Sequence, residues 1–195
     1  MEGRFEIRIA GSGGQGTIVA TEIIGMAAAL YEKDLYVVQT QSYGPEARGG
    51  KSKAEVVISR ELIDYPKVIA PKLQVILTQP AADEYAYDTS SDGRIIYDDF
   101  FITSIPGRGE AEESNRINAK FYHLPIVKTA RDKLGKEIVT NMVALGTAAR
   151  VFELEKIMSP DSLRKAISHH FPDKVELNIQ AFDEGYRLFK ETQPS

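Results

Sequence analysis

Two glycine-rich segments constrain the fold of this chain more than any other feature of its sequence. The first, Gly11-Ser12-Gly13-Gly14-Gln15-Gly16, follows residues 5–9, in which Phe5, Ile7 and Ile9 alternate with charged residues. Such alternation predicts a strand with one buried face, and the apolar run from Ile18 to Leu30 predicts a helix immediately afterwards. A glycine turn between a strand and a helix exposes backbone amides that can receive an anion or let another chain approach closely.

The second segment, Tyr43-Gly44-Pro45-Glu46-Ala47-Arg48-Gly49-Gly50, is too rich in glycine and proline to be ordinary core. Its glycines give the backbone freedom, Pro45 stiffens the turn, and the Arg48 guanidinium offers donors that suit a carboxylate or a phosphate. Two interpretations stay open. Either Glu46 and Arg48 form a local ion pair on a surface turn, or Arg48 faces a subunit interface or an anionic cofactor.

The rest of the sequence alternates strand and helix patterns, which predicts a single α/β domain spanning residues 1–195. Strands are expected at residues 35–39, 54–59, 73–78, 94–97 and 120–124, and further helices at residues 160–170 and 175–189. No helix pattern separates the strands at 35–39 and 54–59, so these two are expected to pair through the second glycine segment. The predicted architecture is a three-layer αβα fold with a mixed, mostly parallel central sheet and a Rossmann-like first βα unit.

Two local expectations accompany this architecture. The helix at residues 18–30 is apolar on almost every side, which predicts burial between the sheet and either a second layer or a partner subunit. Residues 103–119 are expected to form an exposed connection.

Composition excludes several kinds of site. The sequence contains no cysteine, which rules out disulfides, thiolate nucleophiles and cysteine-bound zinc or iron–sulfur clusters on this chain. Its 24 basic and 28 acidic residues are spread along the chain, which argues against nucleic acid or a membrane as a partner. No leader or membrane-spanning run is recognisable, which predicts a cytoplasmic location. No catalytic residue or metal site is expected, because His123, His169, His170, Asp98 and Asp99 are interpreted as structural or solvated.

Gly11, Gly13 and Gly16 match the spacing of the dinucleotide-binding fingerprint. That fingerprint also needs an acidic residue at the end of the second strand to hold a ribose, whereas residues 39–42 are Gln-Thr-Gln-Ser. No Lys-Ser or Lys-Thr follows Gly16, which excludes a nucleoside-triphosphate loop. The alternative interpretation is that the glycines only let the helix pack closely on the strand. Gln15, at the start of the helix, is expected to donate a hydrogen bond outward.

Asn141 opens a third segment, Asn141-Met142-Val143-Ala144-Leu145-Gly146, in a helix otherwise made of small and apolar residues. A buried amide without a partner costs about 1–3 kcal/mol, so Asn141 is expected to bind either a nearby loop backbone or a ligand. The candidate cofactor-binding or interface residues are Gly11, Gly13, Gly14, Gln15, Gly16, Tyr43, Gly44, Pro45, Glu46, Arg48, Gly49, Gly50 and Asn141.

In their order and spacing, these segments closely resemble the gamma subunit of 2-oxoacid:ferredoxin (acceptor) oxidoreductases, and the resemblance spans essentially the whole chain. It is carried by Gly13 to Gly16, Ser42 to Gly50 and Asn141 to Gly146. The Gln41-Ser42 pair and the segment from Ser52 to Val57 look more like 2-oxoglutarate-type than pyruvate-type gamma subunits.

The resemblance implies a place in a complex that oxidatively decarboxylates 2-oxoglutarate to succinyl-CoA. It implies that thiamine diphosphate, Mg²⁺ and iron–sulfur clusters lie on a beta subunit and a ferredoxin-like delta subunit, that a large alpha subunit completes the substrate site, and that ferredoxin accepts the electrons. This chain lacks the Gly-Asp-Gly segment of the thiamine-diphosphate motif, so alone it is expected to bind none of these cofactors and to be inactive.

By the same resemblance, both glycine segments would face the alpha and beta subunits near the mouth of the active site. Contact with coenzyme A there stays open. The alternatives are a pyruvate-type gamma subunit, a stand-alone dinucleotide-binding oxidoreductase and a non-catalytic assembly module. The sequence also leaves open whether the isolated chain forms a homodimer.

Overall fold

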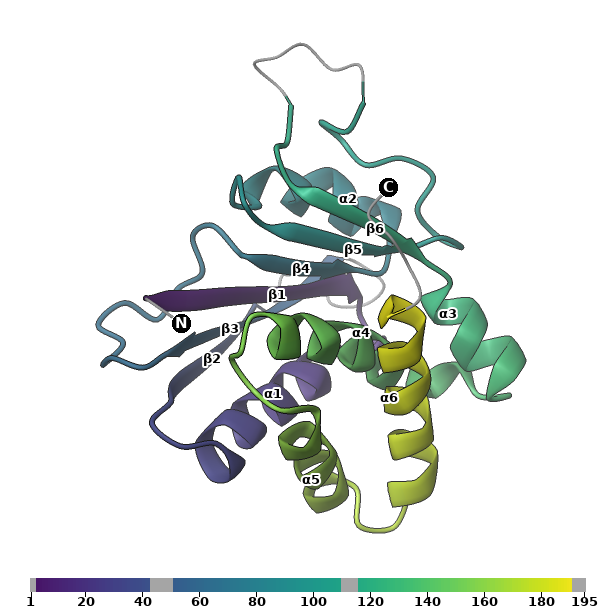
Figure 1. Ribbon diagram of the computed structural model, residues 1–195. Coiled ribbons are helices and arrows are strands. Elements are labelled where there is room, and N and C mark those ends of the chain that lie inside the picture. The colour runs from purple at the N-terminus through teal and green to yellow at the C-terminus, as the bar shows by residue number, and fades with distance from the viewer. Residues whose placement is uncertain (1–2, 43–50, 110–115, 191–195) are drawn as a thin grey trace.

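The fold is built on one six-stranded sheet (Figure 1). The computed structural model describes residues 3–42, 51–109 and 116–190. The strands are β1 (Arg4–Ser12), β2 (Tyr36–Ser42), β3 (Lys51–Ser59), β4 (Leu73–Ile76), β5 (Arg94–Asp98) and β6 (Lys120–Leu124), arranged in the order β2-β3-β1-β4-β5-β6. β3 runs antiparallel to β2 and β1, whereas β1, β4, β5 and β6 pair in parallel. The predicted mixed, mostly parallel sheet is therefore confirmed, including the pairing of the strands on either side of the second glycine segment.

Helices cover both faces of the sheet, which confirms the predicted three layers (Figure 1). One face carries α1 (Thr17–Tyr31), α4 (Thr140–Leu154), α5 (Pro160–His170) and α6 (Val175–Lys190). The other face carries α2 (Gln79–Tyr85), which continues into a 3₁₀ turn at Ala86–Asp88. A short α3 (Ile126–Lys128), a π-helical turn (Thr129–Lys133) and a 3₁₀ turn (Glu137–Val139) connect β6 to α4. Within the described ranges, no helix is both long and apolar enough to cross a membrane.

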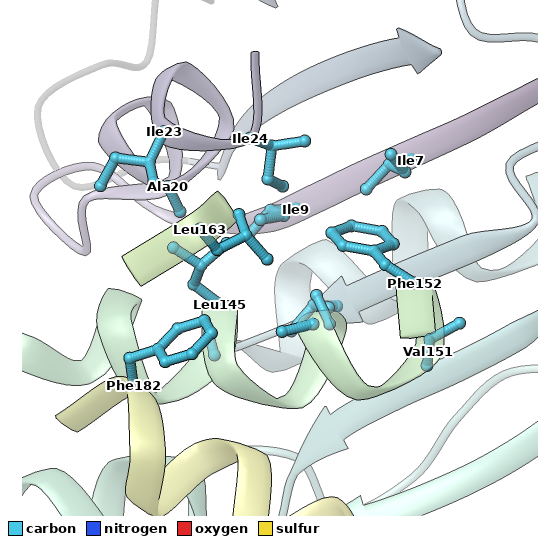
Figure 2. Close-up of a cluster of buried hydrophobic side chains, with 14 of the residues drawn as sticks. Ile7, Ile9, Ala20, Ile23, Ile24, Leu145, Val151, Phe152, Leu163 and Phe182 are labelled. Carbon is cyan, nitrogen blue, oxygen red and sulfur yellow. The ribbon is translucent and has the colours of Figure 1, made fainter. Parts of the chain in front are cut away.

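The larger core lies between the sheet and α1, α4, α5 and α6. Ile7 and Ile9 of β1 point into it and are fully buried, together with Ile23 of α1, Phe152 of α4 and Phe182 of α6 (Figure 2). Burying one large aliphatic or aromatic side chain contributes about 1.5–3 kcal/mol, so this cluster holds the layers together. α1 packs against both the sheet and α5, so a second layer of the same chain covers most of its apolar surface, as one of the two sequence interpretations predicts.

The opposite face of β1 is buried as well, which differs from the sequence expectation of one buried face. The Arg8 side chain is only 2% exposed; its Nε donates to Glu55 Oε1 (2.7 Å), its guanidinium also pairs with Asp88, and it lies over the Tyr85 ring. A buried guanidinium is tolerated only when carboxylates and hydrogen bonds satisfy it. Charged residues in an alternating strand therefore do not mark a solvent face here, because β1 is central and α2 covers it.

α4 and α6 cross in direct backbone contact at Gly146 and Gly185. A Cβ atom on Gly146 would lie 2.0 Å from Phe182 O, and one on Gly185 would lie 1.9 Å from Val143 O. Both distances are far inside van der Waals contact, so this crossing requires glycine on both helices.

The helix predicted at residues 160–170 is confirmed, because α5 begins at Pro160 and Ser159 Oγ caps it by accepting a hydrogen bond from Ser162 N (3.1 Å). The exposed connection predicted at residues 103–119 is wrong in part. Ile105 and Ile117 are 6% and 8% exposed and belong to the smaller core beneath α2. They cover apolar surface of β5 and β6 that the short α2 does not reach. Residues 110–115 of this connection lie outside the described residues.

Asp98, at the carboxyl end of β5, is fully buried and structural. Its Oδ1 accepts hydrogen bonds from Phe100 N (3.0 Å) and Phe101 N (3.1 Å), and its Oδ2 accepts one from Val127 N (2.8 Å). Burial raises the pKa of the Asp98 carboxyl above its ordinary value of 3.8, and the three backbone donors offset this desolvation only in part. The side chain thus ties the end of β5 to the start of α3.

Replacing Asp98 by asparagine is expected to lower the free energy of unfolding by about 1–3 kcal/mol, because the amide nitrogen then opposes the Val127 N–H. Since the folded-state pKa is raised, the stability that Asp98 contributes is complete below pH 3.8 and is lost as the pH rises through the raised pKa. The difference in free energy of unfolding between the wild type and the Asp98→Asn variant should therefore become smaller from acid to neutral pH. Urea unfolding across this pH range measures the difference, with Asp64→Asn, at an exposed position, as the control. A difference in stability that does not change with pH would contradict the raised pKa of Asp98.

Candidate functional site

The first glycine segment forms a closed turn between β1 and α1. The Ser12 N–H donates to Gln15 Oε1 (2.8 Å), and the Gln15 N–H donates to Ser12 O (3.2 Å). A Cβ atom on Gly11 would lie 2.3 Å from Gln15 Oε1, so a side chain at position 11 would displace this contact. The carbonyl end of the Gln15 side chain therefore points inward, and only its amide nitrogen is left to donate outward as the sequence suggests.

Gly14 and Gly16 have left-handed backbone conformations, with φ values of 94° and 70°. Such φ values cost L-amino acids roughly 1–2 kcal/mol, which explains glycine at both positions. The Cβ position of Gly14 is open, whereas a Cβ atom on Gly16 would lie 2.4 Å from Asn141 Nδ2. Gly13 completes the turn and is not among the glycines with positive φ.

Asn141 joins the start of α4 to this turn. Its side chain is largely buried; Nδ2 donates to Gly16 O (3.4 Å), and Oδ1 accepts from Met142 N (3.0 Å). The sequence leaves open whether Asn141 binds a loop backbone or a ligand, and in the structure it binds the backbone of the glycine turn.

The end of β1 and the start of β3 lie side by side, next to the first glycine turn. In the register of these strands, Gly11 lies opposite Ser52 and Ser12 lies opposite Lys51, and the Thr17 and Ser52 hydroxyls approach to 3.4 Å. Residues 43–50, with the candidates Tyr43, Gly44, Pro45, Glu46, Arg48, Gly49 and Gly50, lie outside the described residues, and their roles remain predictions. β3, which follows them in the sequence, begins directly beside the first turn.

A cleft of about 730 Å³ opens beside the first turn. Gly14, Gly16 and Asn141 line one part of it, Lys136, Ile138 and Val139 line a second part, and residues 171–178 at the start of α6 line the third. A smaller cleft of about 250 Å³ shares Ile138 with the larger one and is also bordered by Gln15. Ile138 itself is 82% exposed, which is unusual for a large aliphatic side chain between two hollows.

The electrostatics of the larger cleft favour an anion at its inner end. α1 begins at Thr17 without a side-chain cap and without an acidic residue in its first turn. Its first N–H groups have no intrahelical partner, and the helix dipole places partial positive charge there. Lys136 and Lys174 also line the cleft, although Asp173 and Glu176 sit on the same wall. The arrangement suits a ligand with phosphate groups and an apolar portion.

Sequence reasoning misses most of this cleft. Lys136, Ile138 and residues 171–178 carry no motif and lie more than a hundred positions from the glycine turn. Ile138 gives no signal of its own, because Val139 beside it is also aliphatic and the pair looks like part of the core. The histidines do not contribute: His123 stacks on the Tyr97 ring, and His169 Nδ1 lies 3.1 Å from the Tyr31 hydroxyl. In the part of the chain that the structure describes, no three His, Cys, Asp or Glu side chains could hold a metal ion.

The sheet order also weakens the dinucleotide interpretation. In that fold the strand after the first helix pairs in parallel with the first strand and brings a ribose-binding acid beside the turn. Here β3 separates β2 from β1, and β2 ends in uncharged residues at the edge of the sheet. Among the described residues, no carboxylate is therefore placed as that fingerprint requires.

The glycine turn, the returning β3 and the helical layer together define a three-layer α/β fold with a cleft beside the glycine turn. The chain belongs to the pyruvate ferredoxin/flavodoxin oxidoreductase family, whose model matches residues 6–188. Within this family, the 2-oxoglutarate synthase subunit KorC of Methanocaldococcus jannaschii is 43% identical over 189 residues, which cover 96% of this chain and 95% of that protein.

Two further relatives place the chain among the gamma subunits. The gamma subunit of a keto/oxoacid ferredoxin oxidoreductase from Geobacter sulfurreducens matches the fold with a TM-score of 0.81 at 36% identity, covering 96% of this chain and 99% of that one. The pyruvate synthase subunit PorC of Methanothermobacter marburgensis is 32% identical over 188 residues, covering 95% of this chain and 98% of that protein. The family resemblance stated from the sequence is confirmed.

Proposed function

We propose that this chain is the gamma subunit of a 2-oxoglutarate:ferredoxin oxidoreductase. In the proposed complex, 2-oxoglutarate loses carbon dioxide, its succinyl group is transferred to coenzyme A, and the electrons pass to ferredoxin. The observation that carries the choice of substrate is the higher identity to a 2-oxoglutarate synthase subunit, 43%, than to a pyruvate synthase subunit, 32%. A pyruvate-type gamma subunit is the second candidate, because the match to PorC covers nearly as much of this chain as the match to KorC.

Other chains carry the chemistry in this proposal. Thiamine diphosphate with Mg²⁺ and the iron–sulfur clusters lie on the beta and ferredoxin-like delta subunits, and the alpha subunit completes the substrate site. The absence of cysteine from the sequence supports this division, because cluster irons are held mainly by cysteine thiolates. The complex is assigned to the cytoplasm, and the isolated chain is inactive.

The edge formed by the glycine turn, the second glycine segment and Asn141 faces the partner subunits and contacts coenzyme A. Support comes from the uncapped start of α1 and from Lys136 and Lys174, which suit the phosphate groups of coenzyme A. Gly14, whose Cβ position is open, lets a ligand or partner backbone approach the turn, and Gln15 and Asn141 hold the turn in shape.

The proposal is tested by purifying the tagged chain from its native cells under anaerobic conditions. The eluate is assayed for viologen reduction that depends on coenzyme A and either 2-oxoglutarate or pyruvate. Activity with 2-oxoglutarate that co-purifies with thiamine-diphosphate and iron–sulfur subunits is expected. Preference for pyruvate would favour the second candidate, and a chain that elutes alone and binds a dinucleotide would overturn both.

A double substitution, Lys136→Ala with Lys174→Ala, is expected to raise the KM for coenzyme A by about 10-fold to 100-fold in the assembled complex. Two buried charge-assisted contacts at about 1.5–3 kcal/mol each would change the KM by more than 100-fold, and the solvent exposure of these lysines reduces the effect to the stated range. The kcat should change little, because neither lysine is placed at the reacting centre. Steady-state kinetics with varied coenzyme A measures the effect, and Lys165→Ala, at an exposed position of α5, is the control. An unchanged KM would show that coenzyme A does not bind in this cleft.

A further inference from the structure

We propose that two copies of this chain associate through the open edge of β2 and the adjoining face of α1, so that the sheet continues across a twofold axis. Figure 1 shows β2 at one end of the sheet with α1 beside it. The proposal is independent of the proposed function, because it concerns the chain with itself.

The first observation is the composition of the edge strand. β2 spans seven residues, Tyr36–Ser42, and contains neither a charged residue nor proline. Among the described residues, no strand pairs with its outer side, and Tyr36 is 46% exposed. Natural proteins usually protect a free edge of this length with lysine, proline or a bulge, because unpaired backbone groups recruit another strand. An unprotected edge is expected where a second strand covers it.

The second observation is Gly25, in the middle of α1. A glycine inside a helix costs roughly 0.5–1 kcal/mol relative to alanine. Gly146 and Gly185 have an evident reason for this cost, because a Cβ atom at either position would collide with backbone. At Gly25 the only described atom within 4 Å of a Cβ position is Gln39 Cβ, at 4.0 Å, which is ordinary contact. Its φ is not positive either, so nothing described within the chain demands glycine there.

Gly25 lies on the part of α1 that adjoins β2. Gln39 of β2 meets Gly25, and its Nε2 donates to Thr21 Oγ1 (3.1 Å). Glu22 and Ala29, three and four positions from Gly25, lie on the same stripe and are exposed. The small side chains at positions 25 and 29 leave the helix backbone accessible from outside.

The spacing of these elements favours a second copy as the occupant. α1 packs over both β2 and β3. If β2 pairs antiparallel with its own copy at the usual strand spacing of about 4.8 Å, two such helices come about 10 Å apart on one face of the joined sheet. Helices pack at about 8–10 Å, and small residues at the contact permit the closer end of that range. By twofold symmetry, a second copy supplies both the strand and the helix at this spacing. Because β2 carries no charged side chain, two copies of it do not repel each other.

The test is the mass of the purified full-length chain by sedimentation equilibrium between about 1 and 100 µM. A dimer of the 21.6 kDa chain is expected. Gly25→Ala should weaken it by about tenfold or more, because the added methyl overpacks the helix contact. The same substitution should leave the melting temperature of the dilute monomer unchanged or higher, because alanine favours the helix.

Two stronger variants and one control complete the experiment. Gly25→Arg on α1 and Val38→Lys on β2 should each give a monomer. If Gly25→Arg fails to fold, Val38→Lys still tests the interface. Gln180→Arg, at an exposed position of α6, is the matched control and should remain dimeric. A wild-type chain that is monomeric at the highest concentration overturns the proposal. So does a dimer that survives both Gly25→Arg and Val38→Lys, because it must then use another face.

Discussion

Gly146→Ala is expected to lower the free energy of unfolding by about 3 kcal/mol or more. Overpacking a core costs about 1–3 kcal/mol when side chains can shift, and more when they cannot. At this position the new methyl meets Phe182 O at 2.0 Å and Tyr186 N at 2.7 Å. Both are backbone atoms of α6, so relief requires moving a whole helix away from the larger core.

Chemical denaturation with far-ultraviolet circular dichroism measures this loss. Gly25→Ala, studied at concentrations where the chain is monomeric, is the matched control, because it adds the same methyl to a helix with open space. Gly185→Ala should resemble Gly146→Ala, and the double variant should cost less than the sum of the two, because one displacement of α6 relieves both clashes. A loss below about 1 kcal/mol for Gly146→Ala would show that α4 and α6 do not cross as described.

Gly16→Ala is expected to cost about 2–5 kcal/mol. Roughly 1–2 kcal/mol comes from the left-handed backbone and about 1–3 kcal/mol from the clash with Asn141 Nδ2. Because the clash displaces Asn141, the substitution also separates the start of α4 from the turn. If the turn faces partner subunits as proposed, activity of the complex falls with it.

Gly14→Ala measures the backbone cost alone. The φ of Gly14 is also positive, but its Cβ position is open, so the added methyl meets no neighbour. Replacing Asn141 by alanine in the Gly16→Ala chain should recover part of the second cost, which a double-mutant cycle by urea unfolding would quantify. Equal losses for the Gly14 and Gly16 variants would mean that Asn141 does not pack against the turn.

The strands follow from the sequence because their signals are local. β3 and β6 show alternating or continuous apolar runs bounded by turn residues, and the missing helix between β2 and β3 predicts their antiparallel pairing. The cap at Ser159 needs only the next three residues to be recognised. By contrast, α2 has seven residues, too few for a helical period to be distinguished from a loop.

The cleft and the helix crossing depend on contacts between distant parts of the chain, which no local pattern contains. Lys136 and Lys174 line a common surface only because α4 and α6 cross at Gly146 and Gly185. The inward turn of Gln15 depends on the absence of a side chain at Gly11, so the motif predicts the turn but not which end of the amide faces out. The burial of Arg8 likewise depends on α2 and on Glu55 and Asp88, which are far away in the sequence.

The place of β1 in the sheet bears on the order in which this protein folds. β1 precedes the other strands in the sequence, yet it lies between β3 and β4, with Ile7 opposite both Val56 and Leu73. Closing such long loops costs entropy before any contact offsets it, so the neighbouring pairs β2–β3 and β4–β5 are expected to form first. Docking of β1 then joins two preformed halves. Until that step occurs, β3 and β4 each present an unpaired edge in the interior of the future sheet, which makes the half-folded chain the species most prone to aggregate.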